Sequence, residues 1–269
     1  MDDPKAKAAA TYNAAADFFD DPALAFWERF GQATVDGLNL RAGAHVLDVC
    51  AGSGASAIPA ARRVGATGRV VAVDLAKNLL DLGALKARRE GLTNIEFRVA
   101  DLDDLDYPRE CFDAVVVVFG IFFLPDWHAA TRRLWRLVRR GGQLAVTTWG
   151  PDLFEPANSV FWAAVEEIRP DLHRAYNPWE RLTEPAAVSE LIISSGAPRV
   201  HVEAVDATHE LATVQDFWKI VLGSGYRSTF EAMTDTERQT LRTRVLDELT
   251  QLKVATLNVN VIYAVATKE

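Results

Sequence analysis

The chain has 269 residues, a length that suits one large α/β domain, with or without a lid, and allows a substantial core. Its formal net charge of −8 leaves no source for the counterion release that drives binding to a phosphate backbone, so no nucleic-acid partner is expected. No apolar run of about 18 residues occurs and there are only two cysteines, so we expect a cytoplasmic protein with no transmembrane segment, no disulfide framework and no metal site.

The first 149 residues alternate between helical and strand patterns. Residues 5–38 show a helical pattern that residues 20–22 interrupt, and we expect this segment to cover the sheet or its cleft. Apolar, β-branched runs then predict buried strands that start at residues 45, 70, 94, 112 and 143.

Helices are expected between these strands. One of them is predicted by leucines that recur on a single face, namely Leu75, Leu79, Leu82 and Leu85. Another begins at Pro125 and Asp126, and Gly141 with Gly142 is expected to end it.

The pattern changes after residue 149. Prolines and aromatic residues are frequent in residues 150–195, which we interpret as a helical insertion over the cleft, followed by a helix near 186–195. Residues 199–205 alternate as a sixth strand, residues 213–252 form a helical block, and residues 258–267 close the chain as the last strand.

Strands and helices in this order predict a doubly wound α/β fold around a mostly parallel, seven-stranded sheet. We expect an N-terminal helical cap at residues 1–40 and a ligand-binding core at 41–150. The insertion and its connecting helix then occupy 151–198, and residues 199–269 complete the single domain.

A loop of small residues follows the first strand and is a candidate cofactor site. Such a loop brings backbone N–H groups and a helix N-terminus close to a ligand. Gly52-x-Gly54-x-x-Ala57 satisfies the dinucleotide fingerprint, and Asp74 lies 20 residues after Gly54, where a ribose-binding acid is expected. Asp48 argues against a dinucleotide ligand. Its carboxylate would repel a pyrophosphate, whereas it would attract a cationic group.

Acidic residues follow three successive strands, at Asp48, Asp74 and Asp101. The motifs V-L-D-V-C-A-G-S-G, V-V-A-V-D-L, F-R-V-A-D-L and F-D-A-V-V-V-V-F-G occur in that order within residues 42–150. This arrangement resembles the Rossmann-like class I S-adenosylmethionine-dependent methyltransferases, and most of all the branch typified by ubiquinone and menaquinone C-methyltransferases. One departure is Cys50, which stands where that branch often has its first loop glycine.

The resemblance implies S-adenosylmethionine as cofactor and S-adenosylhomocysteine as product. Asp48 would favour the methionine ammonium, Asp74 would accept hydrogen bonds from the ribose hydroxyls, and Asp101 would accept one from the adenine amino group. Tyr12, in T-Y-N-A-x-A, resembles a family tyrosine that covers the cofactor. The other expected cofactor contacts come from the loop and from apolar residues near strand ends, namely Cys50, Ala51, Gly52, Ser53, Gly54, Leu75, Leu79, Leu102 and Phe119.

Aromatic residues after the fourth and fifth strands and in the insertion suggest a hydrophobic or aromatic small-molecule acceptor. The expected pocket residues are Phe122, Phe123, Trp149 and Trp179, with Arg227 as an anchor for an acceptor anion. In-line methyl transfer depends on positioning and requires a general base only when the nucleophile is not already ionised. His128 and Tyr12 are the weak candidates for a catalytic role.

Three functions remain open from the sequence. The first is methyl transfer to a C, O or N atom of a small molecule. The second is an NAD(P)-dependent oxidoreductase, which Asp48 disfavours. The third is a non-catalytic cofactor-binding protein with a methyltransferase-like fold. The sequence predicts neither the identity of the acceptor nor an oligomeric state.

Overall fold

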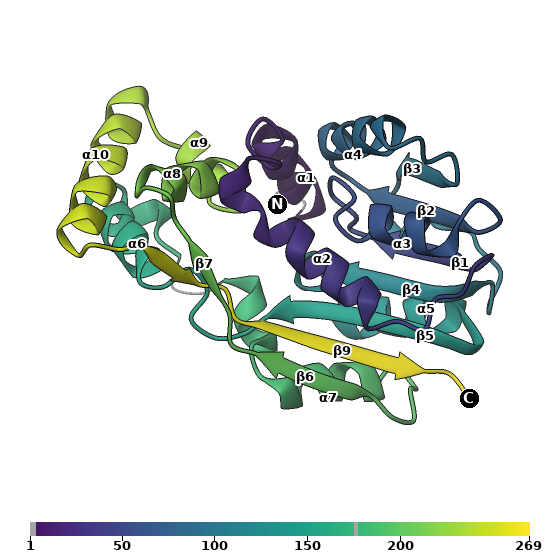
Figure 1. Cartoon of the computed structure of the whole chain (residues 1–269). Coiled ribbons are helices and arrows are strands. Elements are labelled where there is room, and N and C mark those ends of the chain that lie inside the picture. The colour runs from purple at the N-terminus through teal and green to yellow at the C-terminus, as the bar shows by residue number, and fades with distance from the viewer. Residues whose placement is uncertain (1–3, 175–176) are drawn as a thin grey trace.

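A sheet of seven strands, ordered β3-β2-β1-β4-β5-β9-β6, forms the centre of the computed structural model, which describes residues 4–174 and 177–269 (Figure 1). The strands are β1 (His45–Val49), β2 (Arg69–Asp74), β3 (Ile95–Val99), β4 (Phe112–Val118), β5 (Val138–Trp149), β6 (His201–Val205) and β9 (Val261–Thr267). The first five pair in parallel, and β9 runs antiparallel to both β5 and β6. The predicted doubly wound, mostly parallel α/β fold is confirmed.

Helices cover both faces of this sheet (Figure 1). They are α1 (Pro4–Ala15), α2 (Phe26–Asp36), α3 (Ala57–Val64), α4 (Lys77–Arg89), α5 (Trp127–Leu137), α6 (Ala157–Ile168), α7 (Pro185–Ile193), α8 (Gln215–Leu222), α9 (Arg227–Glu231) and α10 (Asp235–Gln251). Short 3₁₀ turns occur at η1 (Pro22–Leu24), η2 (Leu102–Asp104), η3 (Ile121–Phe123), η4 (Pro170–Leu172) and η5 (Pro178–Leu182). Within the described residues, no helix is both long and apolar enough to cross a membrane.

The central strands are apolar because both of their faces are covered. Residues 114–117 of β4 are fully buried, as are Val46 and Leu47 of β1. A parallel strand buried on both faces needs a continuous apolar run, which is the pattern that predicted it. Since β1 pairs with both β2 and β4, the strand order reverses at β1, and ligands of such sheets bind beyond the carboxyl ends of the strands at that point.

The N-terminal and C-terminal parts of the chain meet above this switch point. Helix α1 contacts both α4 and α9, so it bridges the parallel half of the sheet and the C-terminal helices (Figure 1). A separate two-stranded sheet of β7 (Thr208–Glu210) and β8 (Thr256–Asn258) lies at the base of the C-terminal helices. The helical cap therefore lies where it can close a ligand site.

The buried face of α4 differs from the expected leucine face. The buried residues are Leu79, Leu80, Gly83 and Ala87, whereas Leu85 is 40% exposed and Leu75 precedes the helix. A Cβ on Gly83 would lie 2.5 Å from Cε1 of Phe97 in β3. Close approach of the helix backbone at Gly83, rather than the leucine spacing, therefore sets the buried face.

The glycine pair at 141–142 does not end α5, contrary to expectation. The helix ends at Leu137, and β5 begins at Val138, which pairs with Phe112 of β4. The register then shifts, so that the next pair is Ala114 with Gln143. The two glycines thus lie in an irregularity within β5, where the Gly141 φ of +74° places that residue in the left-handed region.

A substitution at Gly31 tests how closely α2 packs on the loop after β1. A Cβ on Gly31 would lie 2.4 Å from the carbonyl oxygen of Ala55, a backbone atom with little freedom to shift. Gly31→Ala should therefore lower the free energy of unfolding by about 1–3 kcal/mol in urea, although alanine is the better helix former. Gly37→Ala, at the end of the same helix, is the control because its Cβ would meet no heavy atom closer than 3.5 Å. Equal stability of the two variants would contradict this packing.

Candidate functional site

The loop between β1 and α3 is tied to the end of β2 by backbone hydrogen bonds. The N–H of Ala51 donates to the carbonyl of Val73 (3.0 Å), and the N–H of Gly52 donates to Oδ2 of Asp74 (2.9 Å). Cys50 and Gly52 both adopt positive φ, +58° and +53°. The sharp course of the loop requires this backbone conformation, which costs cysteine more than glycine.

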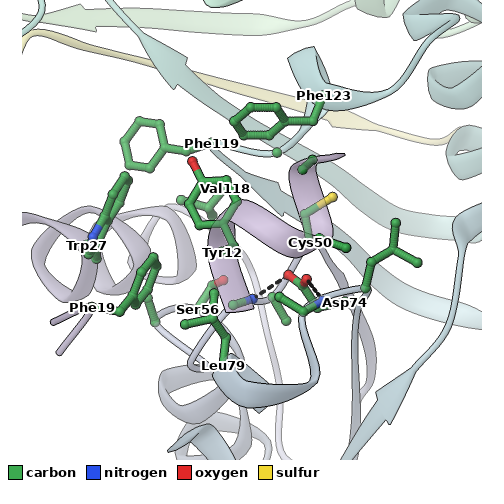
Figure 2. A pocket seen from close by; sticks show the side chains of 18 of the residues that line it. Tyr12, Phe19, Trp27, Cys50, Ser56, Asp74, Leu79, Val118, Phe119 and Phe123 are labelled. Atoms are coloured by element: carbon green, nitrogen blue, oxygen red, sulfur yellow. Dashed lines mark hydrogen bonds between the residues drawn. The ribbon is translucent and has the colours of Figure 1, made fainter. Parts of the chain in front are cut away.

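Asp74 ends β2 and faces the cavity beside the loop (Figure 2). Besides the bond from Gly52, its Oδ1 accepts the N–H of Ala76 at 2.8 Å. Burial raises the pKa of Asp74, and these backbone donors oppose that effect. Each carboxylate oxygen keeps further acceptor capacity, so Asp74 is able to accept hydrogen bonds from a ligand in the cavity.

The cavity beside the loop, here named the loop pocket, spans about 870 Å³ when the open solvent at its mouth is included. Eight residues expected at a cofactor site line it: Tyr12, Cys50, Ala51, Gly52, Asp74, Leu75, Leu79 and Phe119. Sequence reasoning missed other lining residues, among them Lys5, Phe19, Trp27, Ser56, Ala76 and Gly120. Lys5, Phe19 and Trp27 come from the N-terminal segment, for which the sequence pattern predicts only that it covers the sheet or its cleft.

Asp48 lies behind the loop rather than on the pocket wall. Only 1% of it is exposed, and its Oδ2 accepts the hydroxyl hydrogen of Ser56 at 2.7 Å. Burial raises the pKa of Asp48 to about 7, and the charge of Asp74 adds to the shift. Because Ser56 lines the loop pocket, Asp48 acts on the pocket through Ser56 and the start of α3.

Three further expected cofactor contacts do not line the loop pocket. The hydroxyl of Ser53 donates to Asp20 at 2.6 Å, and the N–H of Gly54 donates to the carbonyl of Ala51 at 2.8 Å. Leu102 is buried in the main hydrophobic core. Of the predicted loop residues, only Cys50, Ala51 and Gly52 therefore line the cavity.

Asp101 is held by the N-terminal helix. Nζ of Lys5 donates to both carboxylate oxygens of Asp101, at 2.9 and 2.7 Å, and to Asp103 at 2.6 Å. Burial alone would raise the pKa of Asp101, but the hydrogen bonds from Lys5 and the N–H of Asp103 outweigh burial and lower it. Lys5 lines the loop pocket, so this ion pair lies at its edge.

A second, smaller cavity, here named the aromatic pocket, adjoins the first. The two share Tyr12, Trp27, Phe119 and Phe123 as a common wall (Figure 2). The remaining lining residues are Phe122, Trp149, Leu153, Phe154, Trp179, Ser224, Gly225 and Tyr226. The structure therefore brings four of the five expected acceptor residues together: Phe122, Phe123, Trp149 and Trp179.

The shared wall is fixed by ring packing. The rings of Phe119 and Trp149 stack with centroids 3.7 Å apart and an interplanar angle of 12°. Phe119 has a φ of +51°, a strained conformation for a bulky residue that directs its ring to the boundary of the two pockets. Tyr12 packs edge-on against Phe123 at 5.5 Å.

Arg227 and His128 line neither pocket among the described residues. Nε of Arg227 donates to Glu231 at 2.7 Å, so its charge is directed along α9. Nδ1 of His128 lies 3.0 Å from the hydroxyl oxygen of Ser194, which joins the start of α5 to the end of α7. Within residues 4–174 and 177–269, no three His, Cys, Asp or Glu side chains gather as metal ligands.

A model of the ubiE/COQ5 methyltransferase family matches residues 8–172. The chain is 32% identical over 163 residues to the ubiquinone/menaquinone biosynthesis C-methyltransferase UbiE of Cronobacter sakazakii. That match covers 60% of this chain and 64% of the relative, so the chain spans less than two thirds of the relative's length.

Solved structures share the fold at low sequence identity. One is a putative methyltransferase from an antibiotic biosynthesis pathway of Anabaena variabilis, with a TM-score of 0.62, 15% identity, and coverage of 89% of this chain and 96% of that chain. Another is phosphoethanolamine N-methyltransferase 2 of Haemonchus contortus, with a TM-score of 0.60, 16% identity, and coverage of 100% and 60%. At these identities the similarity shows a common fold.

The raised pKa of Asp48 predicts a pH dependence of stability. In the folded chain Asp48 keeps its proton up to about pH 7, whereas an unfolded aspartate, of pKa about 3.9, releases it earlier. Its contribution to the free energy of unfolding is therefore fully present below about pH 4 and is lost as pH rises to 7, by up to about 1.4 kcal/mol per pH unit.

Asp48→Asn should remove this dependence, so that the variant gains stability relative to the wild type between pH 5 and 7 in urea unfolding. Asp216→Asn is the control. The pKa of Asp216 is lowered despite its burial, because Lys219 and the Thr213 N–H donate to it, so its effect should stay constant over this range. A constant difference between the wild type and Asp48→Asn would show that Asp48 is ionised throughout.

Proposed function

The chain belongs to the ubiE/COQ5 methyltransferase family, and we propose on that basis that it transfers a methyl group from S-adenosylmethionine to an uncharged, hydrophobic or aromatic small molecule. The observation that carries this proposal is the pair of adjoining pockets. One contains a buried carboxylate at the end of β2, and the other is almost entirely aromatic. Four residues line both pockets, so ligands in the two pockets would lie next to each other at these residues.

The residues of the loop pocket suit S-adenosylmethionine. Asp74 has acceptor capacity for two ribose hydroxyls, and the apolar side chains of Leu75 and Leu79 suit the faces of an adenine ring. Asp101 would accept from the adenine amino group after sharing or releasing Lys5. When bound, the cofactor supplies an electrophilic methyl group on a positively charged sulfur.

The chain itself would hold the cofactor and the acceptor in position and shield them from water. Helix α1 covers the loop pocket with Ala8, Ala9 and Tyr12. Tyr12, Phe119 and Phe123 lie where the two pockets meet, so they would orient the acceptor toward the methyl group. Correct alignment of two reactants contributes up to about 7–11 kcal/mol to lowering a barrier.

No described side chain in the aromatic pocket is suited to accept a proton at neutral pH. Its titratable groups are Tyr12 and Tyr226, and burial raises the pKa of both phenols. The acceptor therefore enters as a reactive nucleophile or loses its proton to solvent. This absence of a base agrees with a reaction that depends on alignment.

The acceptor is expected to be uncharged because no Lys, Arg, Asp, Glu or His lines the described part of the aromatic pocket. The names of the UbiE relatives make a nucleophilic ring carbon of a phenol or hydroquinone, the reduced form of a quinone, the first acceptor to test. However, Trp179, Ser224, Gly225 and Tyr226 lie beyond the family match, which ends at residue 172. We therefore infer that the acceptor pocket is partly specific to this chain and keep C, O and N acceptors in the test.

Calorimetric titration with S-adenosylmethionine tests the cofactor assignment. Asp74→Ala should weaken binding by about 1–3 kcal/mol, roughly 5- to 150-fold, because two ribose hydroxyls lose their acceptor. Asp81→Ala is the matched control, since Asp81 is exposed on α4 and pairs with Lys77.

Unchanged affinity of the Asp74 variant for S-adenosylmethionine would refute the role of Asp74. Binding of NAD(P) in place of S-adenosylmethionine would indicate an oxidoreductase. Cofactor binding without release of S-adenosylhomocysteine, across a panel of uncharged aromatic acceptors, would instead indicate a non-catalytic protein.

A further inference from the structure

Two residues that line the aromatic pocket each carry a buried hydrogen-bond donor without a partner among the described residues. These donors are the hydroxyl of Ser224, a residue that is 3% exposed, and the indole N–H of Trp27. A buried polar group left unpaired destabilises the folded chain, because it loses its hydrogen bonds to water and gains none in return. The hydroxyl of Tyr226, another residue of this pocket, is satisfied because it donates to Oδ1 of Asn158 at 2.6 Å.

Ser224 is held in place by its backbone and not by its hydroxyl. It lies in the turn between α8 and α9, where its carbonyl accepts the N–H of Arg227 at 3.0 Å. A Cβ on the preceding residue, Gly223, would lie 2.7 Å from Cδ2 of Leu24, so the turn packs tightly on the N-terminal segment. The fold therefore positions the Ser224 side chain without using its polar atom.

Trp27 is fixed in a similar way by its ring. It stacks on Phe19 with centroids 5.3 Å apart and an interplanar angle of 5°, and it packs against Phe119 at 5.6 Å. It lines both pockets, so it lies at the boundary where a methyl group would cross. Its N–H has no acceptor within residues 4–174 and 177–269.

We propose that Ser224, assisted by Trp27, forms the polar end of the aromatic pocket and binds one oxygen atom of the acceptor. This inference rests on the proposed methyltransferase function and narrows its substrate class. Two unpartnered donors, in a pocket whose described lining is aromatic and carries no charged side chain, suit a hydrogen-bond-accepting oxygen on an uncharged ring, such as a phenol or an aryl ketone. Ser224 thus takes the anchoring role expected of Arg227, whose guanidinium is engaged by Glu231.

The test compares two probes that differ by one oxygen, 1-naphthol and naphthalene, in equilibrium dialysis against the chain saturated with S-adenosylhomocysteine. Ser224→Ala should weaken binding of 1-naphthol by about 3- to 10-fold and leave naphthalene within about twofold of the wild type. Ser195→Ala is the matched control, because that buried hydroxyl already donates to the carbonyl of Ile192 and lies outside both pockets.

Trp27→Phe should weaken binding of 1-naphthol in the same direction as Ser224→Ala. Trp162→Phe is its control, since it removes another unpartnered indole N–H that lines neither pocket.

The stability of the free variant gives a second readout. Ser224→Ala removes an unpaired buried hydroxyl, so its urea midpoint without ligand should equal or exceed that of the wild type. A lower midpoint with unchanged 1-naphthol affinity would show that the hydroxyl is structural and would overturn the proposal. Equal affinities of the wild type for the two probes, or binding of neither, would also overturn it. Failure to bind S-adenosylhomocysteine would instead contradict the proposed function itself, so the two failures are distinguishable.

Discussion

The carboxylate of Asp74 is the contact on which the site depends. It holds the N–H of Gly52 and the N–H of Ala76 at once, so it joins the loop after β1 to the loop after β2. These loops form one side of the loop pocket, and their separation follows from this one buried group. The buried charge is tolerated because backbone donors satisfy it, and the same group faces the cavity, where a ligand can use its remaining lone pairs.

A second constraint is the ring packing between the two pockets. Phe119, at the end of β4, stacks on Trp149, at the end of β5, and both rings lie next to Trp27 of α2. Strand ends that are neighbours in the sheet thus present their aromatic side chains to one place, and the N-terminal segment closes it. The aromatic pocket is therefore a product of the sheet order together with α1 and α2, and it requires the C-terminal turn at Ser224 for its polar end.

The sequence was sufficient for the strands and for part of the site. Runs such as residues 114–117 must be buried on both faces, so their position in the sheet follows from composition alone. The cavity-facing role of Asp74 followed from its position at a strand end. The orientation of Asp48 could not be predicted in this way. A residue at the end of a strand faces either a cavity or the underside of a loop, and the course of that loop decides which. Likewise, Lys5 meets Asp101 and Ser224 meets the rings only through long-range packing that no local pattern encodes.

The central claim is that the two pockets are the halves of one active site. A crystal structure with S-adenosylhomocysteine and 1-naphthol bound together tests it most directly. We expect the ribose of S-adenosylhomocysteine at Asp74 and its sulfur at the wall formed by Tyr12 and Phe119. The naphthol ring is expected in the aromatic pocket, with its oxygen at Ser224. An S-adenosylhomocysteine molecule bound away from Asp74, or a naphthol ring separated from the sulfur by that wall, would contradict the claim.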